Sequence, residues 1–181
     1  MKLRLLFYTL LIFVGVTMSA CGDDDDDDAP PPHEVGIWDL KNYALINVPA
    51  DYASNEGRRF ELNQVNLGIE SYELNLEASG TFSRDINFTG VIPQEDMGTW
   101  AVNEGELTLD SNDFDDNESF GIEKNESDDL WLSFPLQFSL IQDDVLDTLT
   151  QEYADSLTDE EFSDLFDPVN VDFVFLFERD E

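Results

Sequence analysis

Residues 72–88 read Tyr-Glu-Leu-Asn-Leu-Glu-Ala-Ser-Gly-Thr-Phe-Ser-Arg-Asp-Ile-Asn-Phe, and this stretch decides the fold class of the chain. Apolar and polar residues alternate up to Ser79-Gly80, and the alternation resumes beyond it with Phe82, Ile86 and Phe88. A period of two places neighbouring side chains on opposite faces of a β-strand, and Ser-Gly is a typical turn. The stretch therefore predicts a β-hairpin with one apolar face.

Similar alternation recurs from Gly36 onward. It predicts a second hairpin about Asn103-Glu104-Gly105, a third that ends in Leu130, Leu132 and Phe134, and a closing strand with Val169, Val171, Phe173, Phe175 and Phe177. Two further strands, at about 36–48 and 58–69, shift their apolar phase by one residue midway. One extra residue in a strand is the mark of a β-bulge, so we expect a bulge in each.

This pattern predicts an all-β domain built as an antiparallel meander. An open sheet of this length would expose two unpaired edges. We therefore expect it to close into an eight-stranded barrel, whose interior holds side chains or one small ligand. A β-sandwich is the alternative architecture, because periodicity does not separate the two.

Residues 143–167 break the alternation. Their apolar residues fall near helical spacing, Thr158 and Glu161 fit a capping box, and Pro168 ends the segment. We expect a pair of short amphipathic helices inserted before the last strand. This helical insertion would serve either as a cap over one barrel end or as a mobile lid or partner-docking element.

The first twenty residues have the organisation of a secretory signal peptide. Lys2 and Arg4 precede an apolar run from Leu5 to Val14, which is too short for a comfortable membrane span. Cys21 follows Ser19-Ala20 and is the only cysteine in the chain, so no intramolecular disulfide can form.

A tether follows Cys21. Six aspartates, Asp23 to Asp28, and three prolines, Pro30 to Pro32, form a segment that repels itself and stays extended. We divide the chain into a signal peptide at 1–20, a tether at 21–34 and a β-domain at 35–181.

Two of these features resemble the corresponding features of bacterial lipoproteins. The ending Ser19-Ala20-Cys21 resembles a lipobox, which implies cleavage before Cys21 and acylation of that residue. The acidic run resembles the surface-export signal of Bacteroidetes-type lipoproteins, which implies an outer-membrane lipoprotein displayed at the cell surface. A periplasm-facing lipoprotein with a plain solvated tether is the alternative.

The domain itself resembles the lipocalin superfamily. Gly36-Ile37-Trp38 looks like the Gly-x-Trp that opens the first strand of that family, and Gly98-Thr99-Trp100 repeats the pattern. The resemblance implies that Trp38 plugs the closed end of a barrel and that Arg179, near the end of the last strand, packs over it. With the Gly80-Thr81-Phe82 turn, the chain looks like the lipocalin-like domains of Bacteroidetes-type lipoproteins, a group that implies a barrel but no particular ligand.

The charge of the chain excludes some partners. The formal net charge is −34, from 42 acidic and 8 basic residues, and loss of Lys2 and Arg4 with the signal peptide would take it to −36. Nucleic acids and anionic lipids are bound through Lys and Arg, so neither is expected as a partner. Such a surface favours cations, cationic partners or solubility alone.

Catalytic and metal-binding chemistry has few candidates. The single histidine, His33, lies beside the proline tether, so a histidine-based triad or a Cys/His zinc site is not expected. No cofactor is expected apart from calcium, which takes oxygen ligands. Its candidates are Asp110, Asp113, Asp115 and Asp116 in one acidic loop.

These observations favour a non-enzymatic, lipid-anchored domain for binding or scaffolding. Its expected partners are the membrane, through the lipid at Cys21, and a small apolar ligand or another surface protein. Trp38, Phe82, Trp100 and Phe173 are candidates for the ligand cavity or for simple core packing. The alternative is a hydrolase of surface polymers, which would need two inward-facing carboxylates in a cleft.

Overall fold

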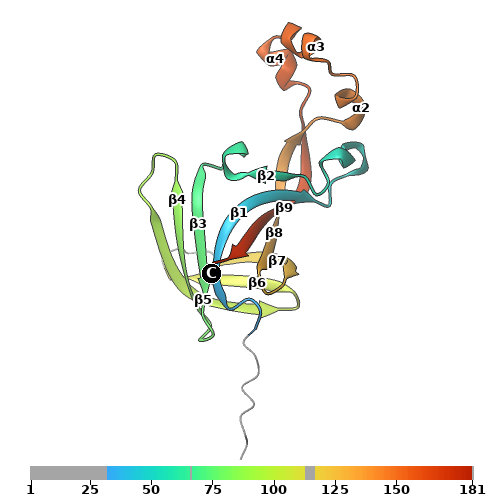
Figure 1. Ribbon diagram of the computed structural model, residues 1–181. Coiled ribbons are helices and arrows are strands. Elements are labelled where there is room, and N and C mark those ends of the chain that lie inside the picture. The colour runs from blue at the N-terminus through green and yellow to red at the C-terminus, as the bar shows by residue number, and fades with distance from the viewer. Residues whose placement is uncertain (1–31, 66, 113–116, 181) are drawn as a thin grey trace, which may run out of the picture. The chain divides into compact units, whose positions relative to one another are not determined.

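The computed structural model describes residues 32–180, except 66 and 113–116. Among these residues, nine antiparallel strands form one sheet in the order β2-β1-β3-β4-β5-β6-β7-β8-β9, and β1 also pairs with β9. Eight strands therefore close into a barrel and β2 is an addition to it (Figure 1). The predicted antiparallel meander and its closure are confirmed.

The strands follow the predicted hairpins closely. The hairpin at 72–88 is β3–β4, the hairpin about Gly105 is β5–β6, and the third is β7–β8. Their bounds are β1 (Gly36–Ile46), β2 (Arg59–Glu61), β3 (Ile69–Leu76), β4 (Thr81–Phe88), β5 (Gln94–Asn103), β6 (Glu106–Ser111), β7 (Glu118–Asn125), β8 (Asp129–Leu140) and β9 (Asp167–Arg179).

One of the two predicted bulges is present. The register of β1 against β9 shifts between Leu40 and Asn42, where the apolar phase of the sequence also shifts. This bend accompanies a change of partner, because β1 pairs with β3 up to Asp39 and with β2 from Asn42 to Ala44.

The second predicted bulge is wrong. Residues 58–69 do not form one strand: β2 ends at Glu61 and is followed by the 3-10 helix η2 (Leu62–Gln64). Glu61 and Gln64 cap this turn reciprocally through their side chains. Such local side-chain hydrogen bonds offer the backbone an alternative to pairing in the sheet. A 3-10 turn and a β-bulge produce the same shift of apolar phase, so the sequence pattern does not distinguish them.

The core lies inside the barrel. Its fully buried side chains come from strands around the whole circumference and include Trp38, Leu74, Leu107, Phe173 and Phe177. A smaller apolar cluster lies on the outer face of β9, where Ala44, Val174 and Leu176 pack with Ile46 and Trp131. Residues 32–181 thus form a compact unit with a core of its own, which is what independent folding requires.

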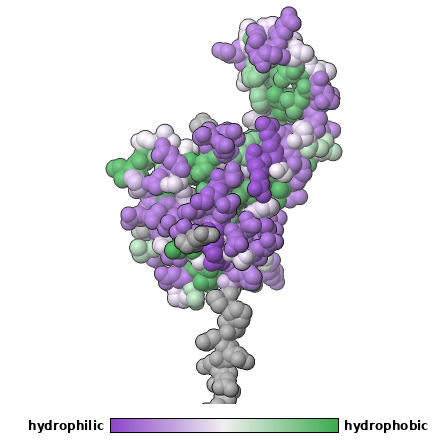
Figure 2. All heavy atoms as spheres, in the orientation of Figure 1, coloured by the Kyte–Doolittle hydropathy of each residue, from purple (hydrophilic) through white to green (hydrophobic). Residues whose placement is uncertain are grey.

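The insertion before β9 contains three short helices, α2 (Asp143–Leu146), α3 (Gln151–Ser156) and α4 (Asp159–Ser163). The capping box of Thr158 and Glu161 is confirmed. The α2 helix lies against η1 (Ala50–Asn55), where Ser54 donates to Asp143. No residue of the three helices is buried, and their exposed apolar side chains make the insertion less hydrophilic than the visible face of the barrel (Figure 2).

Candidate functional site

The barrel interior contains a mainly apolar pocket of about 380 Å³. It lies between β3 and β4 on one side and β7, β8 and β9 on the other. Its lining residues are Ile69, Tyr72, Arg84, Ile86, Glu118, Ser119, Phe120, Phe134 and Phe175. Its volume is in the range of small-molecule sites, and apolar walls with a few convergent polar groups are the usual composition of such sites.

A larger hollow of about 730 Å³ lies elsewhere, where β1 leaves β3. Its walls are mainly polar and come largely from η2 and the loop that follows it, including Asn63, Gln64 and Gly68. No buried charge lines it among the described residues, whereas the interior pocket has a buried guanidinium in its wall. We therefore take the interior pocket as the candidate functional site.

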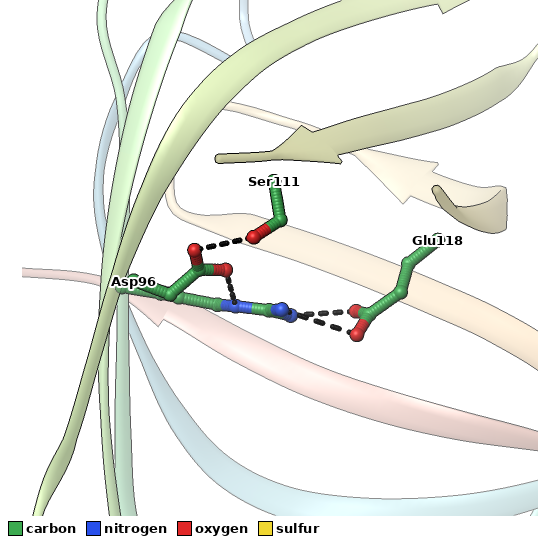
Figure 3. Close-up of polar contacts among 4 residues, drawn as sticks. Asp96, Ser111 and Glu118 are labelled. Carbon is green, nitrogen blue, oxygen red and sulfur yellow. Dashed lines mark hydrogen bonds and ion pairs between the residues drawn. The ribbon is translucent and has the colours of Figure 1, made fainter. Parts of the chain in front are cut away.

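Arg84 is the centre of a polar cluster in the pocket wall. Its Nε donates to Asp96 Oδ2 at 2.8 Å, and its Nη1 and Nη2 donate to Glu118 Oε2 and Oε1 at 2.5 and 3.1 Å. Ser111 donates to the other oxygen of Asp96 at 2.6 Å. Figure 3 shows Asp96, Ser111 and Glu118 grouped around this guanidinium.

The register of the sheet brings these residues together. Arg84 and Asp96 are direct cross-strand partners on β4 and β5, and they share the inward face with Phe82. Glu118 reaches the same point from β7, at its first residue. Arg84 and Asp96 are buried, with 5% and 3% of their side chains exposed, whereas 43% of the Glu118 side chain is exposed.

The environment raises the pKa of two groups in the wall, Arg84 and Tyr72. Burial disfavours the charge of Arg84, but the hydrogen bond with Glu118 and the neighbouring charges outweigh burial and raise its pKa above the ordinary value. Burial raises the pKa of the Tyr72 hydroxyl above its ordinary value. At neutral pH the wall therefore presents a permanent cation and a neutral phenol.

The four aromatic residues predicted for a cavity or core do not line the pocket. Trp38, Phe82 and Phe173 are buried in the core, with at most 2% of each residue exposed. Trp100 is half-buried, and its indole Nε1 donates to the carbonyl oxygen of Glu77 at 2.9 Å. The pocket walls instead use Tyr72, Phe120, Phe134 and Phe175.

The closed end of the barrel has the contact that the resemblance implies. The guanidinium of Arg179 lies over the Trp38 ring, 4.3 Å from the centroid, and donates to the carbonyl oxygens of Val35 and His33. A Cβ at Gly36 would lie 2.1 Å from Arg179 Nη1, so the Gly of this Gly-x-Trp leaves the space that Arg179 occupies.

Two residues assigned to the tether also contact the closed end. The carbonyl oxygen of Glu34 accepts from Trp38 Nε1 at 2.7 Å, and its buried carboxylate accepts from Asn125 at 2.7 Å. The carbonyl oxygen of His33 accepts from Arg179. The ordered contacts of the domain therefore begin a little before residue 35.

Two groups of candidates fall on residues that the structure does not describe. Cys21, the expected lipidation site, lies outside the described residues, as do the calcium candidates Asp113, Asp115 and Asp116. Asp110 is exposed near the end of β6. Across the described part of the chain, no three His, Cys, Asp or Glu side chains are grouped so as to hold a metal ion.

Two carboxylates do point into the barrel, as the hydrolase alternative requires, but only Glu118 lines the pocket. Asp96 is buried behind it and accepts from Arg84 and Ser111 through its two oxygens. Both acids bind one guanidinium. Glycoside hydrolysis needs two carboxylates that face opposite sides of one scissile bond, and this arrangement does not provide them.

No protein-family model and no curated protein matches the chain. In the part of the chain that the structure describes, no helix has the length and apolar character needed to cross a membrane.

Proposed function

We propose that this chain is a lipid-anchored lipoprotein of the outer membrane, displayed at the cell surface, whose barrel binds a small and mainly apolar ligand. The observation that carries the binding role is the aromatic pocket inside the barrel, with its buried ion cluster. A side-chain core beside an apolar pocket within the same barrel is the arrangement of barrels that hold one small ligand.

Membership of the lipocalin-like lipoproteins is part of this proposal. Its support is the Gly-x-Trp at Gly36 to Trp38 together with the stacking of Arg179 on Trp38. The lipid anchor is supported by the lipobox-like ending at Cys21, and surface display by the run from Asp23 to Asp28. Periplasm-facing attachment remains the alternative location.

Replacing Cys21 with serine is expected to abolish fatty-acid attachment, because the chain has no other cysteine thiol. Metabolic labelling with a fatty acid in the native host measures this. Protease added to intact cells should also cleave the anchored wild-type chain, whereas a periplasm-facing chain would be protected. Equal labelling of the Cys21→Ser chain would rule out the proposed anchor.

Binding can be tested with N-phenyl-1-naphthylamine, a neutral fluorescent probe, added to soluble residues 32–181. Ile86→Trp places an indole in the pocket and is expected to weaken binding about tenfold or more, because the probe and the indole need the same volume. Met97→Trp is the matched control, since Met97 lies on the outer face of β5 and is 58% exposed. Thermal melting verifies that both variants fold.

Equal probe affinities for Ile86→Trp and wild type would contradict binding in the barrel. Absence of probe binding to wild type would leave only the scaffold role for the domain.

A further inference from the structure

The polar cluster at the pocket carries more negative than positive charge. One cation, Arg84, faces two carboxylates, Asp96 and Glu118. One carboxylate is enough to balance the guanidinium, and Asp96 is the one buried directly against it, where Ser111 holds it. Glu118 is therefore the surplus charge, and the three groups together have a net charge of −1.

Glu118 is also the accessible member of the cluster. Its side chain is 43% exposed and lines the pocket, whereas Asp96 does not line it. Each oxygen of Glu118 accepts one hydrogen bond from Arg84. A carboxylate offers about four lone-pair sites, so Glu118 can accept further donors from a ligand.

The remaining walls suit the body of an organic cation. Tyr72, Phe120, Phe134 and Phe175 present aromatic rings around the pocket. Aromatic faces attract cations as well as apolar groups, and this attraction increases when the cation is removed from water. The pocket volume of about 380 Å³ accommodates a small amphiphile.

The net charge of the whole chain also favours a cationic ligand. A formal net charge of −34 produces a negative potential that concentrates cations near the surface and repels anions. An anionic ligand would meet this potential and would also have to displace Glu118 from Arg84. A cationic ligand is attracted by this potential, and it can bind without separating Glu118 from Arg84.

We propose that the pocket takes an organic cation with an apolar body, whose ammonium group binds Glu118 while the body lies between Phe120, Phe134 and Phe175. The inference rests on the proposed binding function and adds the ligand class to it. Glu118 is then the residue that determines specificity, and Arg84 and Asp96 hold its carboxylate in place.

Three probes of one size and shape separate the head groups: 4-phenylbutylamine, 4-phenylbutanol and 4-phenylbutyrate. Calorimetric titration of residues 32–181 is expected to give an amine affinity about tenfold or more above that of the alcohol, with the carboxylate weakest. Glu118→Gln should lower amine affinity about tenfold, to about the level of the alcohol, and should lower alcohol affinity much less, because the alcohol has no charge to lose its partner. Its amide oxygen can still accept from Arg84, so this variant retains part of the cluster.

The matched control is Asp85→Asn. Asp85 follows Arg84 on β4 but is exposed on the outer face, so the variant removes one negative charge outside the barrel. Its effect on amine affinity should be at most about twofold in physiological salt, because exposed charges are screened. Equal losses in Glu118→Gln and Asp85→Asn would overturn a specific role for Glu118.

The remaining outcomes separate this inference from the binding function. Tighter binding of 4-phenylbutyrate would overturn the cationic class and point to Arg84 as the anchor of an anionic ligand. Binding of N-phenyl-1-naphthylamine without binding of 4-phenylbutylamine would also overturn it, while the pocket would remain a binding site. If neither compound binds, the binding function itself is contradicted.

Discussion

Replacement of Arg84 by methionine is expected to destabilise the domain by about 3–5 kcal/mol, the usual cost of removing one partner of a buried ion pair. The cost arises because Asp96, with 3% of its side chain exposed, would remain in the barrel wall without its cation. Urea unfolding of residues 32–181, compared with wild type at the same pH, measures the change in the free energy of unfolding.

The double variant Arg84→Met/Asp96→Leu tests whether the loss of stability comes from the unpaired buried carboxylate of Asp96 or from lost packing around Arg84. Apolar replacement of both members of a buried pair is often neutral, so the double variant should regain most of the stability lost by Arg84→Met. If Arg84→Met is as stable as wild type, the Asp96 carboxylate is not buried away from water, and the described cluster does not exist in solution.

Replacement of Arg179 by methionine is expected to cost about 3 kcal/mol, because it removes three charged hydrogen bonds to backbone carbonyls, one of them part-buried, and the cation–π contact. Arg179 connects the end of β9 to the start of the domain, since it contacts Trp38 and the carbonyl oxygens of His33, Val35 and Ser127. Urea unfolding again measures the loss.

Two comparisons test the reason for this loss. Arg179→Lys should recover less than half of it, because an ammonium group lacks the planar fork that reaches several carbonyls. Lys41→Met removes an exposed ion pair with Asp39 and should change stability by no more than about 0.5 kcal/mol. If Lys41→Met lowered the free energy of unfolding as much as Arg179→Met, the Arg179 contacts at the closed end would have no specific role in stability.

The strands were predictable because their alternation is a local signal. The hairpin from Tyr72 to Phe88 and the bulge after Leu40 could be placed from the sequence alone. The segment from Leu62 to Gln64 could not, because a 3-10 turn and a bulge shift the apolar phase in the same way. The contact of Arg179 with Trp38 depended on a resemblance, since the two residues lie far apart in the sequence.

The pocket was harder to predict than the fold. Arg84 did carry a signal, because it occupies the inward phase between Phe82 and Ile86, where an apolar residue is expected. Its partners depend on the register of β4 against β5 and on the path of β7, which bring Asp96 and Glu118 to it. Periodicity identifies the face of a strand, but it does not identify which strands meet across a barrel.

NMR of residues 32–181 with bound N-phenyl-1-naphthylamine tests most directly whether the interior of the barrel is a binding site. We expect intermolecular nuclear Overhauser effects between the probe and the rings of Phe120, Phe134 and Phe175, which line the pocket. Contacts confined to Ala44, Val174 and Leu176 on the outer face of β9, with none to the pocket rings, would contradict the account.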